Sequence, residues 1–355
     1  MKNASKTDLK SLVLNELQDH LRELGEPSYR ADQIVEWLYR KHIDGVDRMT
    51  DLSLALRKRI SEKFSLGKVD VVRVLGARDT TRKFLFRLPD GNLIESVLIP
   101  ASLALYGGRS DRLTICVSTQ VGCAYGCKFC ASGLEGFSRN LSADEIVNQF
   151  IAVESETAEK IDNVVFMGMG EPLANLENVL RAIRIINAEW GLGVGARHIT
   201  ISTSGLAPQI RKLAEEPLQI RLAVSLHAAT DEVRNRIMPI NRRYNIETLV
   251  SACDYYSSHK KQRLTFEYIL IADMNDSDEQ AYLLSRHARR LSAKVNLIPY
   301  NNVSGLPWTR PSEERQKKFL SILRADGIPA TLRHEKGHDI DAACGQLRLQ
   351  TQREI

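Results

Sequence analysis

The amino-acid sequence predicts an α/β protein: a partial (β/α)6 barrel that follows a small N-terminal helical domain and a set of short β-strand extensions. Three observations predict it: helical spacing of apolar residues near the N-terminus, three short strand patterns after it, and a long alternation of strands and helices from residue 113 onward. The expected divisions are a helical domain at 1–66, a β-rich linker or extension at 67–112, the barrel core at 113–345 and a short tail at 346–355.

The first 66 residues are predicted to be helical. Apolar residues recur at i, i+3, i+4 and i+7 in Ala31, Ile34, Val35 and Leu38, which places them on one face of a helix. A second helix is expected at residues 52–64. We expect a small helical domain with Trp37 and Leu38 in its core. An RNA contact from the basic run at residues 57–59 would add to that packing role.

Residues 67–112 are predicted to form short strands. The segments VDVVRVL, KFLFRL and LIESVLI are rich in β-branched and aromatic residues, and a Pro-Asp-Gly turn at residues 89–91 separates the last two. Residues 102–111 contain a Gly-Gly pair and are expected to form a loop.

The core from residue 113 alternates between apolar strands and helical patterns. The strand candidates are LTICVS, NVVFMG, HITIS, IRLAVSLH, TFEYILI, KVNLIPY and PATLRH, and the helix candidates lie near 142–157, 176–190, 207–215, 246–258, 277–291 and 312–326. Such alternation predicts a parallel sheet covered by helices. Six or seven units are too few for an eight-unit barrel, so we expect an open barrel with its functional site at the carboxyl ends of the strands.

Charge and hydropathy set limits on the class of protein. The 49 basic and 44 acidic residues give a net charge of +5, which is compatible with nucleic acid but is weak support for it. No stretch approaches the roughly 18 apolar residues of a membrane span. The polar N-terminus lacks the features of a signal peptide. We therefore expect a cytoplasmic protein with no membrane contact.

Three of the six cysteines form a candidate metal site. Cys123, Cys127 and Cys130 have the spacing CxxxCxxC directly after a predicted strand. A structural zinc site usually has four closed ligands in two separated pairs, and only one triplet is present here. An iron–sulfur cluster normally takes four cysteines, so a triplet leaves one iron open to a substrate. Zinc remains the alternative, whereas Cys253 on its predicted helix is expected to be a small buried hydrophobe.

Polar residues end several of the predicted strands. They occur in FMGMGEPL at Gly168, Gly170 and Glu171, in ISTSG at Ser202, in VSLHA at Ser225 and His227, and in IPYNN at Asn301. Each alone is typical of an ordinary strand end or helix cap. Together they lie where a barrel gathers its active site.

The motifs together resemble a known family. The cysteine spacing, with Phe129 before the last cysteine, is similar to that of the radical S-adenosylmethionine superfamily. The strings DRLTICVSTQVGCAYGCKFCASG, GMGEPLANLENV, ISTSG, LAVSLHAATDEVRNRIMPINRRYNIETL and GHDIDAACGQL, with LGEPSYRADQIVEWLY and RMTDLSLALRKRI, resemble the dual-specificity ribosomal and transfer RNA adenine C2 methyltransferases over residues 20–348. A sister group methylates C8 of adenine and is the alternative, as is a non-catalytic, metal-containing RNA-binding protein.

The resemblance implies cofactors, partners and residue roles. It implies a 4Fe–4S cluster on Cys123, Cys127 and Cys130, two S-adenosylmethionine molecules per turnover, 23S rRNA and tRNA as substrates, an external electron donor such as flavodoxin or ferredoxin, and a monomer. The implied cofactor contacts are Gly170, Glu171, Ser202, Ser225, Leu226, His227 and Asn301. Cys344 would carry the methyl group, Cys116 would be its thiol partner, and Glu95 would be the general base. The segment between Glu95 and Cys116 is several residues longer than expected for the family.

The implied chemistry suits the target atom. Adenine C2 lies between two ring nitrogens and is too electron-poor to attack a methyl sulfonium. A radical route removes that obstacle if the methyl group is first placed on a thiolate, which is the nucleophilic form of cysteine. A thiol–disulfide displacement between Cys116 and Cys344 would then release the product.

Overall fold

The computed structural model of the 355-residue chain describes residues 6–101, 112–134, 136–301 and 305–333. Its N-terminal part is a small helical unit built from α1 (Leu14–Glu23), α2 (Tyr29–Tyr39) and α3 (Leu54–Lys63), with short 3-10 turns η1 (Leu9–Ser11) and η2 (Val46–Arg48). Two short strands, β1 (Thr7–Asp8) and β2 (Phe64–Ser65), pair in parallel and close the unit. Leu38 is buried as expected, whereas Trp37 is only partly buried and packs against the core.

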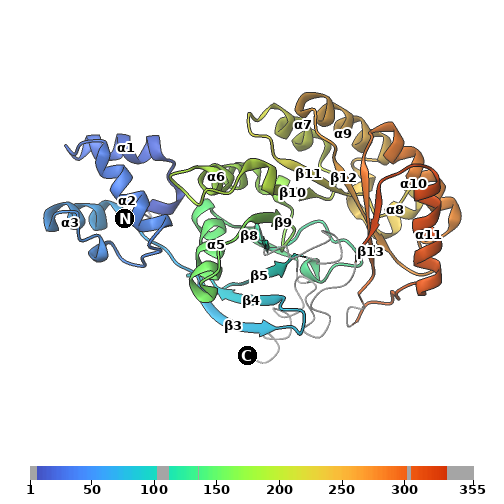
Figure 1. Cartoon of the computed structure of the whole chain (residues 1–355), viewed down its shortest axis with the longest axis horizontal. Coiled ribbons are helices and arrows are strands. Elements are labelled where there is room, and N and C mark those ends of the chain that lie inside the picture. Colours follow the sequence, from blue (N-terminus) through green and yellow to red (C-terminus); the bar gives the residue numbers. More distant parts are fainter. Residues whose placement is uncertain (1–5, 102–111, 135, 302–304, 334–355) are drawn as a thin grey trace.

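One ten-stranded sheet organises the rest of the chain (Figure 1). Its order is β14-β13-β12-β11-β10-β9-β6-β5-β4-β3. The parallel strands are β6 (Leu113–Cys116), β9 (Asn163–Phe166), β10 (Ile199–Thr203), β11 (Arg221–Ser225), β12 (Thr265–Leu270), β13 (Lys294–Pro299) and β14 (Ala330–Leu332). The segment expected as a linker adds antiparallel strands β3 (Asp70–Gly76), β4 (Arg82–Arg87) and β5 (Leu93–Pro100) to the β6 edge of this sheet.

Helices connect each parallel strand to the next, so that the strands and helices form six β/α units. They are α5 (Ala143–Thr157), α6 (Leu176–Asn187), α7 (Ala207–Glu215), α8 (Asp231–Ile237), α9 (Ile246–Lys260), α10 (Asp278–Arg290) and α11 (Glu313–Ala325). The 3-10 turns η3 (Ala131–Gly133), η4 (Pro172–Asn175), η5 (Ala196–His198) and η6 (Pro239–Arg242) and an antiparallel pair, β7 (Gln120–Gly122) with β8 (Phe137–Asn140), complete the described elements. None of the helices in the described part of the chain has the length and apolar content needed to cross a bilayer.

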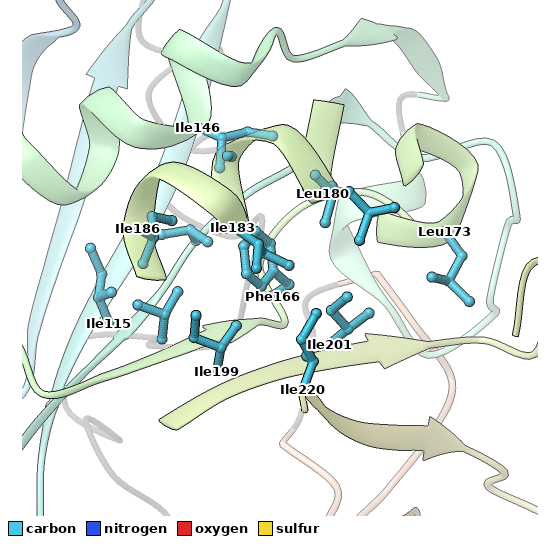
Figure 2. Close-up of a cluster of buried hydrophobic side chains, with 14 of the residues drawn as sticks. Ile115, Ile146, Phe166, Leu173, Leu180, Ile183, Ile186, Ile199, Ile201 and Ile220 are labelled. Carbon is cyan, nitrogen blue, oxygen red and sulfur yellow. The ribbon is translucent and has the colours of Figure 1, made fainter. Parts of the chain in front are cut away.

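The alternation of side chains along each strand separates a core face from an inner face. Figure 2 shows the core face, where Ile115, Phe166 and Ile199 of the strands meet Ile146 of α5 and Ile183 of α6. Because side chains alternate along a strand, the register places the neighbours of these residues on the opposite face. Those inner-face residues are Cys116, Val165, Thr200, Ser202, Ala223, Ser225, Glu267 and Asn296. The inner face is therefore where polar side chains are available for chemistry.

Candidate functional site

The three cysteines lie in a tight loop at the carboxyl end of β6, between β7 and η3. Gly122 adopts φ +74°, and a side chain there would collide with the carbonyl oxygen of Gly136. That close approach lets the Cys123 N–H donate to the Gly136 carbonyl at 2.9 Å. Gly122 thus lets the backbone wrap tightly around the loop, because glycine adopts this conformation without strain.

Three separate elements hold this loop in place. The Lys128 N–H donates to the carbonyl of Ile237, the last residue of α8, at 2.9 Å. The indole Nε1 of Trp308 donates to the Lys128 carbonyl at 3.0 Å. The ring of Phe129 meets His227 edge-on, with centroids 4.9 Å apart at 88°. The positions of the thiols are therefore set by the barrel rather than by the loop alone.

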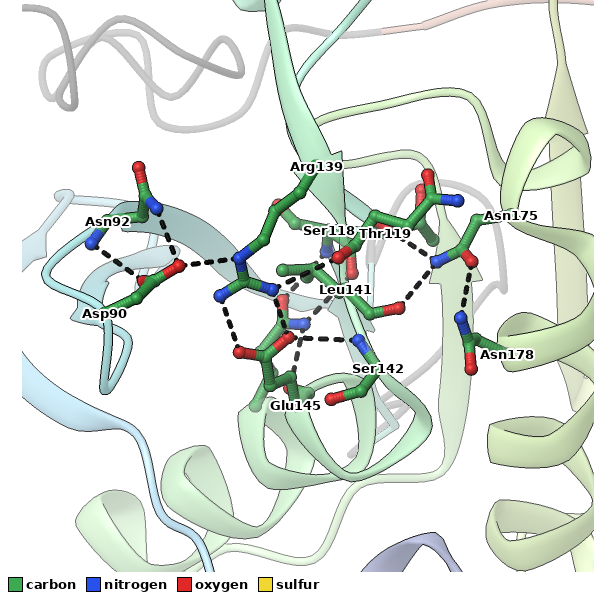
Figure 3. A network of polar contacts seen from close by, with 12 residues as sticks. Asp90, Asn92, Ser118, Thr119, Arg139, Leu141, Ser142, Glu145, Asn175 and Asn178 are labelled. Carbon is green, nitrogen blue, oxygen red and sulfur yellow. Dashed lines mark hydrogen bonds and ion pairs between the residues drawn. The ribbon is translucent and has the colours of Figure 1, made fainter. Parts of the chain in front are cut away.

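The β7–β8 pair anchors the base of the loop (Figure 3). Arg139 of β8 makes a two-pronged contact with Glu145 of α5, at 2.7 and 2.8 Å, and donates to Asp90 in the β4–β5 turn at 2.6 Å. The hydrogen bond from Arg139 lowers the pKa of Asp90 to about 2. Asn175 donates to the carbonyls of Thr119 and Leu141 at 2.9 and 2.7 Å. The strand extension, the loop and two core helices thus share one polar network.

The thiols fit an iron–sulfur cluster better than a single metal ion. Burial raises the pKa of Cys123 to about 11 and raises that of Cys127 further, and negative charge on Cys123 or Cys130 would raise the pKa of Cys127 as well. Among the described residues, no three His, Cys, Asp or Glu side chains converge on a point where one ion would bind. Zinc would draw each sulfur to about 2.3 Å of one ion, whereas a cube binds each thiolate through its own iron. A cationic cluster would supply the charge that three partly buried thiolates need.

Glu171 lies beside the loop and is almost fully buried, at 3% exposed. Its carboxylate accepts hydrogen bonds from the N–H groups of Leu173, at 3.1 Å, and Ser204, at 2.7 Å. Its own N–H donates to the Gln120 side chain at 2.8 Å. Burial raises the pKa of Glu171. These contacts join η4 to the end of β10 and fix the carboxylate at the carboxyl edge of the sheet.

The glycine before Glu171 permits a close approach. Gly170 adopts φ +97°, and a Cβ atom there would overlap the side chain and backbone of Gln120. The missing side chain therefore lets Gln120 of β7 pack directly against the backbone at this point.

The serine pair and His227 lie at adjacent strand ends. Ser202 and Ser225 are partly buried on the inner face of β10 and β11. His227 adopts φ +59°, and its Nδ1 accepts from the N–H of Ile269 at 3.0 Å. Burial, followed by the charge of Arg234, lowers the pKa of His227 to about 3. The imidazole is therefore neutral with its proton on Nε2.

A residue that the sequence analysis did not single out connects these strand ends. Arg234 of α8 is 0% exposed. Its guanidinium donates to the carbonyls of Ser204 (2.6 Å), Leu226 (3.0 Å) and Ser225 (3.3 Å) and to Asn241 Oδ1 (2.9 Å). Burial lowers its pKa to about 10, so it remains cationic at neutral pH. Its string, DEVRNRI, reads as a charged surface helix, and only the three-dimensional contacts reveal a buried cation.

Glu95 and Cys116 lie on the neighbouring strands β5 and β6. Both are buried, and the register with Val97 places them on the same face of the sheet. Glu95 forms an ion pair with Lys83 of β4 at 3.1 Å, with side chains 2% and 0% exposed. Lys83 was not expected, because KFLFR alone reads as an ordinary strand. The Ser118 hydroxyl donates to the Glu95 carbonyl at 2.6 Å.

The structure says little about two of the predicted site residues. Asn301 follows β13 and is partly buried. Cys344 lies outside the described residues. The structure thus brings the cysteine triplet, Glu171, Ser202, Ser225 and His227 to one edge, next to the strand pair that carries Glu95 and Cys116.

Comparisons with known proteins agree with this arrangement. A model of the radical SAM superfamily matches residues 117–284, and a model of the ribosomal RNA large subunit methyltransferase N-terminal domain matches residues 7–66. A crystal structure of a radical SAM methyltransferase from Sphaerobacter thermophilus is 47% identical, has a TM-score of 0.89, and covers 96% of this chain and 98% of its own. The predicted fold class is confirmed.

Relatives at high identity span nearly the whole chain. A protein of Akkermansia muciniphila named "probable dual-specificity RNA methyltransferase RlmN" is 52% identical, with 94% of this chain and 93% of that protein covered. A protein of Syntrophotalea carbinolica named "dual-specificity RNA methyltransferase RlmN" is 45% identical, with coverages of 98% and 91%. The chain therefore belongs to the family of radical S-adenosylmethionine dual-specificity RNA methyltransferases.

Proposed function

We propose that this protein transfers a methyl group from S-adenosylmethionine to C2 of adenosine in 23S rRNA and in tRNA. The observation that carries the proposal is the clamped CxxxCxxC loop at the carboxyl edge of a partial barrel, in a chain 45–52% identical to relatives named as dual-specificity RNA methyltransferases. When bound, a 4Fe–4S cluster on Cys123, Cys127 and Cys130 supplies the electron that cleaves S-adenosylmethionine to a 5′-deoxyadenosyl radical.

The residues around the loop would bind and orient the methyl donor. Glu171 would accept a hydrogen bond from the ammonium group of S-adenosylmethionine. The neutral His227 would pack against S-adenosylmethionine without placing its own positive charge beside the sulfonium. Ser202, Ser225, Leu226, Gly170 and Asn301 would complete the contacts. The partly buried positions of Ser202 and Ser225 on the inner face support these roles.

Three further residues would carry out the transfer. Cys344 would take the methyl group as a thiolate. After the 5′-deoxyadenosyl radical removes one hydrogen from this methyl group, its carbon would bond to C2, and the adduct would give up one electron, which the cluster can take back, together with the C2 proton. Glu95, which forms an ion pair with Lys83, would accept the C2 proton. Cys116 would then attack the sulfur of Cys344, release the methylated base and leave a disulfide, which an external reductant restores to two thiols.

Partners, compartment and domain roles follow from this chemistry. We propose a flavodoxin or ferredoxin as electron donor, a monomer as the active form, and the cytoplasm, where both RNA substrates occur. The target base would leave its stack, at a cost of a few kcal/mol. Residues 1–66 would contact the RNA, residues 67–112 would supply Glu95, residues 113–345 would hold the cofactors, and residues 346–355 would form a short tail.

The test is anaerobic reconstitution followed by assay on rRNA fragments and tRNA. We expect a brown protein with about four irons per chain and, after nuclease digestion, 2-methyladenosine by mass spectrometry. With a CD3-labelled donor, the product should lose one deuterium, because the radical removes a hydrogen from the methyl group. Retention of all three deuteriums would contradict the radical route, and 8-methyladenosine would assign the chain to the sister group. Colourless protein that contains zinc would support a non-catalytic RNA-binding protein.

A variant tests the methyl carrier separately. Cys344→Ala should lose methylation and still cleave S-adenosylmethionine, because the cluster ligands are untouched. Normal methylation by this variant would show that Cys344 is not the carrier.

A further inference from the structure

A basic cavity opens at the edge of the sheet opposite to the cysteine loop. Its volume is about 730 Å³, and its lining includes Arg197, Arg221, Lys261, Arg263 and Lys294. Arg221 and Lys294 are the first residues of β11 and β13, Arg197 lies in η5 just before β10, and Lys261 and Arg263 lie just before β12. Because these strands are parallel neighbours (Figure 1), the cations collect along one rim.

The five rim cations differ in their surroundings from the cations on the outer helices. All five side chains are exposed. Within the part of the chain that the structure describes, no carboxylate forms an ion pair with any of them. The outer helices differ: Arg290 pairs with Glu247 at 2.8 Å, and Lys318 pairs with Asp278 at 2.6 Å. Like charges gathered without partners repel one another, which an anionic ligand would relieve.

The interior of the cavity has the opposite character. Its inner lining includes Glu267, which is buried and accepts from Asn296 Nδ2 at 2.7 Å. Lys260 also lines the cavity, but its ammonium donates to the carbonyls of Glu216 and Leu218. A phosphate would find its cations at the rim, because the carboxyl of Glu267 and the ammonium of Lys260 in the interior are already hydrogen-bonded, and this favours a backbone that lies along the rim over a small anion enclosed in the cavity.

We propose that this rim binds the phosphate backbone of the substrate RNA, away from the nucleotide that is methylated. The inference rests on the proposed function. Strands of five to six residues separate the two edges, which is roughly 17–20 Å at about 3.3 Å per residue. A folded RNA whose target base enters at the carboxyl edge is large enough to extend this far. Phosphate contacts of this kind fix the position of the RNA and do not read its sequence.

The experiment compares RNA binding by two double variants of the full-length reconstituted protein. Arg221→Gln with Arg263→Gln removes two rim cations, and Lys317→Gln with Lys318→Gln removes two exposed, ion-paired cations on α11. Affinity for a tRNA and for an rRNA fragment is measured between about 50 and 400 mM salt. Each lost phosphate contact should reduce the slope of log K against log salt by about 0.9, so the rim variant should bind about 10- to 100-fold more weakly near 0.1 M salt. The control should bind like the parent.

The outcomes separate this inference from the proposed function. If the parent methylates RNA and the rim variant binds with an unchanged affinity and salt slope, the rim is not an RNA site. If the rim variant has a higher KM for long RNA but an unchanged KM for a short hairpin, the contact lies away from the target base, as proposed. Equal weakening on both RNAs would place the contact at the target itself and overturn the proposal. A parent that binds RNA in the expected salt-dependent manner but never methylates it would contradict the proposed function alone.

Discussion

The two edges of the main sheet use the same basic side chains in opposite ways. At the carboxyl edge, Arg234 is fully buried, and its N–H groups donate hydrogen bonds to neutral oxygens. At the amino edge, Arg221 and Arg263 are exposed and face a cavity without ion-pair partners among the described residues. A buried guanidinium that is fully hydrogen-bonded fixes backbone geometry, whereas an exposed and unpaired one attracts anions from solution.

The two edges also differ in how strongly their proposed roles depend on exact side-chain positions. The carboxyl edge holds the cysteine loop, Glu171 and a neutral His227, all with defined hydrogen bonds or ring contacts. A site of this kind tolerates little change in position. The amino edge depends on net charge, so the loss of one cation there should weaken binding and leave the fold intact. The following predictions test this contrast, beginning with the largest expected effect.

Loss of one cysteine of the loop should abolish activity without unfolding the protein. Cys127→Ala removes one of three thiolates, and the Lys128 contacts with Ile237 and Trp308 stay in place. We expect iron content to fall from about four per chain to near zero, with no cleavage of S-adenosylmethionine. Cys253→Ala is the matched control, because Cys253 is buried in α9 and is not one of the three loop cysteines. Full iron content in Cys127→Ala would refute the ligand assignment.

Loss of the buried guanidinium should affect stability. Arg234→Met leaves buried carbonyls without donors, which should cost about 3 kcal/mol, or a fall in melting temperature of roughly 4 °C for a chain of 355 residues. Thermal unfolding of the metal-free protein measures it. Arg236→Met, at an exposed position on the same helix, should stay within about 0.5 kcal/mol of the parent. Equal effects of the two substitutions would show that burial of Arg234 has no special role.

Much of the fold was predictable because its signals are local. The apolar runs NVVFMG and KVNLIPY become β9 and β13, and the amphipathic stretch at 142–157 becomes α5. The seven-residue α8 was missed, since it is short and contains only two apolar residues. The expected strand LTICVS ends at Cys116, and a separate β7–β8 pair follows, for which strands of three and four residues gave no sequence signal.

In the candidate site, too, residues with a local sequence signal were predicted and residues defined by long-range contacts were not. The cysteine spacing lies within eight residues, so the sequence alone predicted a cluster loop. The partners of Glu95 and of the strand ends, Lys83 and Arg234, depend on contacts between elements far apart in the chain or on burial that composition does not reveal. An arginine in a charged helix reads as exposed, because lone buried cations are rare.

The smallest expected effect is a dependence of stability on pH that comes from His227. Burial lowers the pKa of this imidazole to about 3, compared with an ordinary value of 6.5. Below pH 6.5 the unfolded chain binds a proton at this position and the folded chain does not, so stability is lost as pH falls from 6.5 toward about 3. One such group costs about 1.4 kcal/mol per pH unit in that window.

His227→Gln should make the slope of unfolding free energy of the metal-free protein between pH 6.5 and 5.5 shallower by about 1 kcal/mol per pH unit. His259→Gln, at an exposed position on α9, is the control and should leave the slope unchanged. Parallel pH profiles for the parent and His227→Gln would mean that the folded and unfolded chains bind the proton of His227 equally, and the neutral imidazole assigned to the carboxyl edge would be wrong.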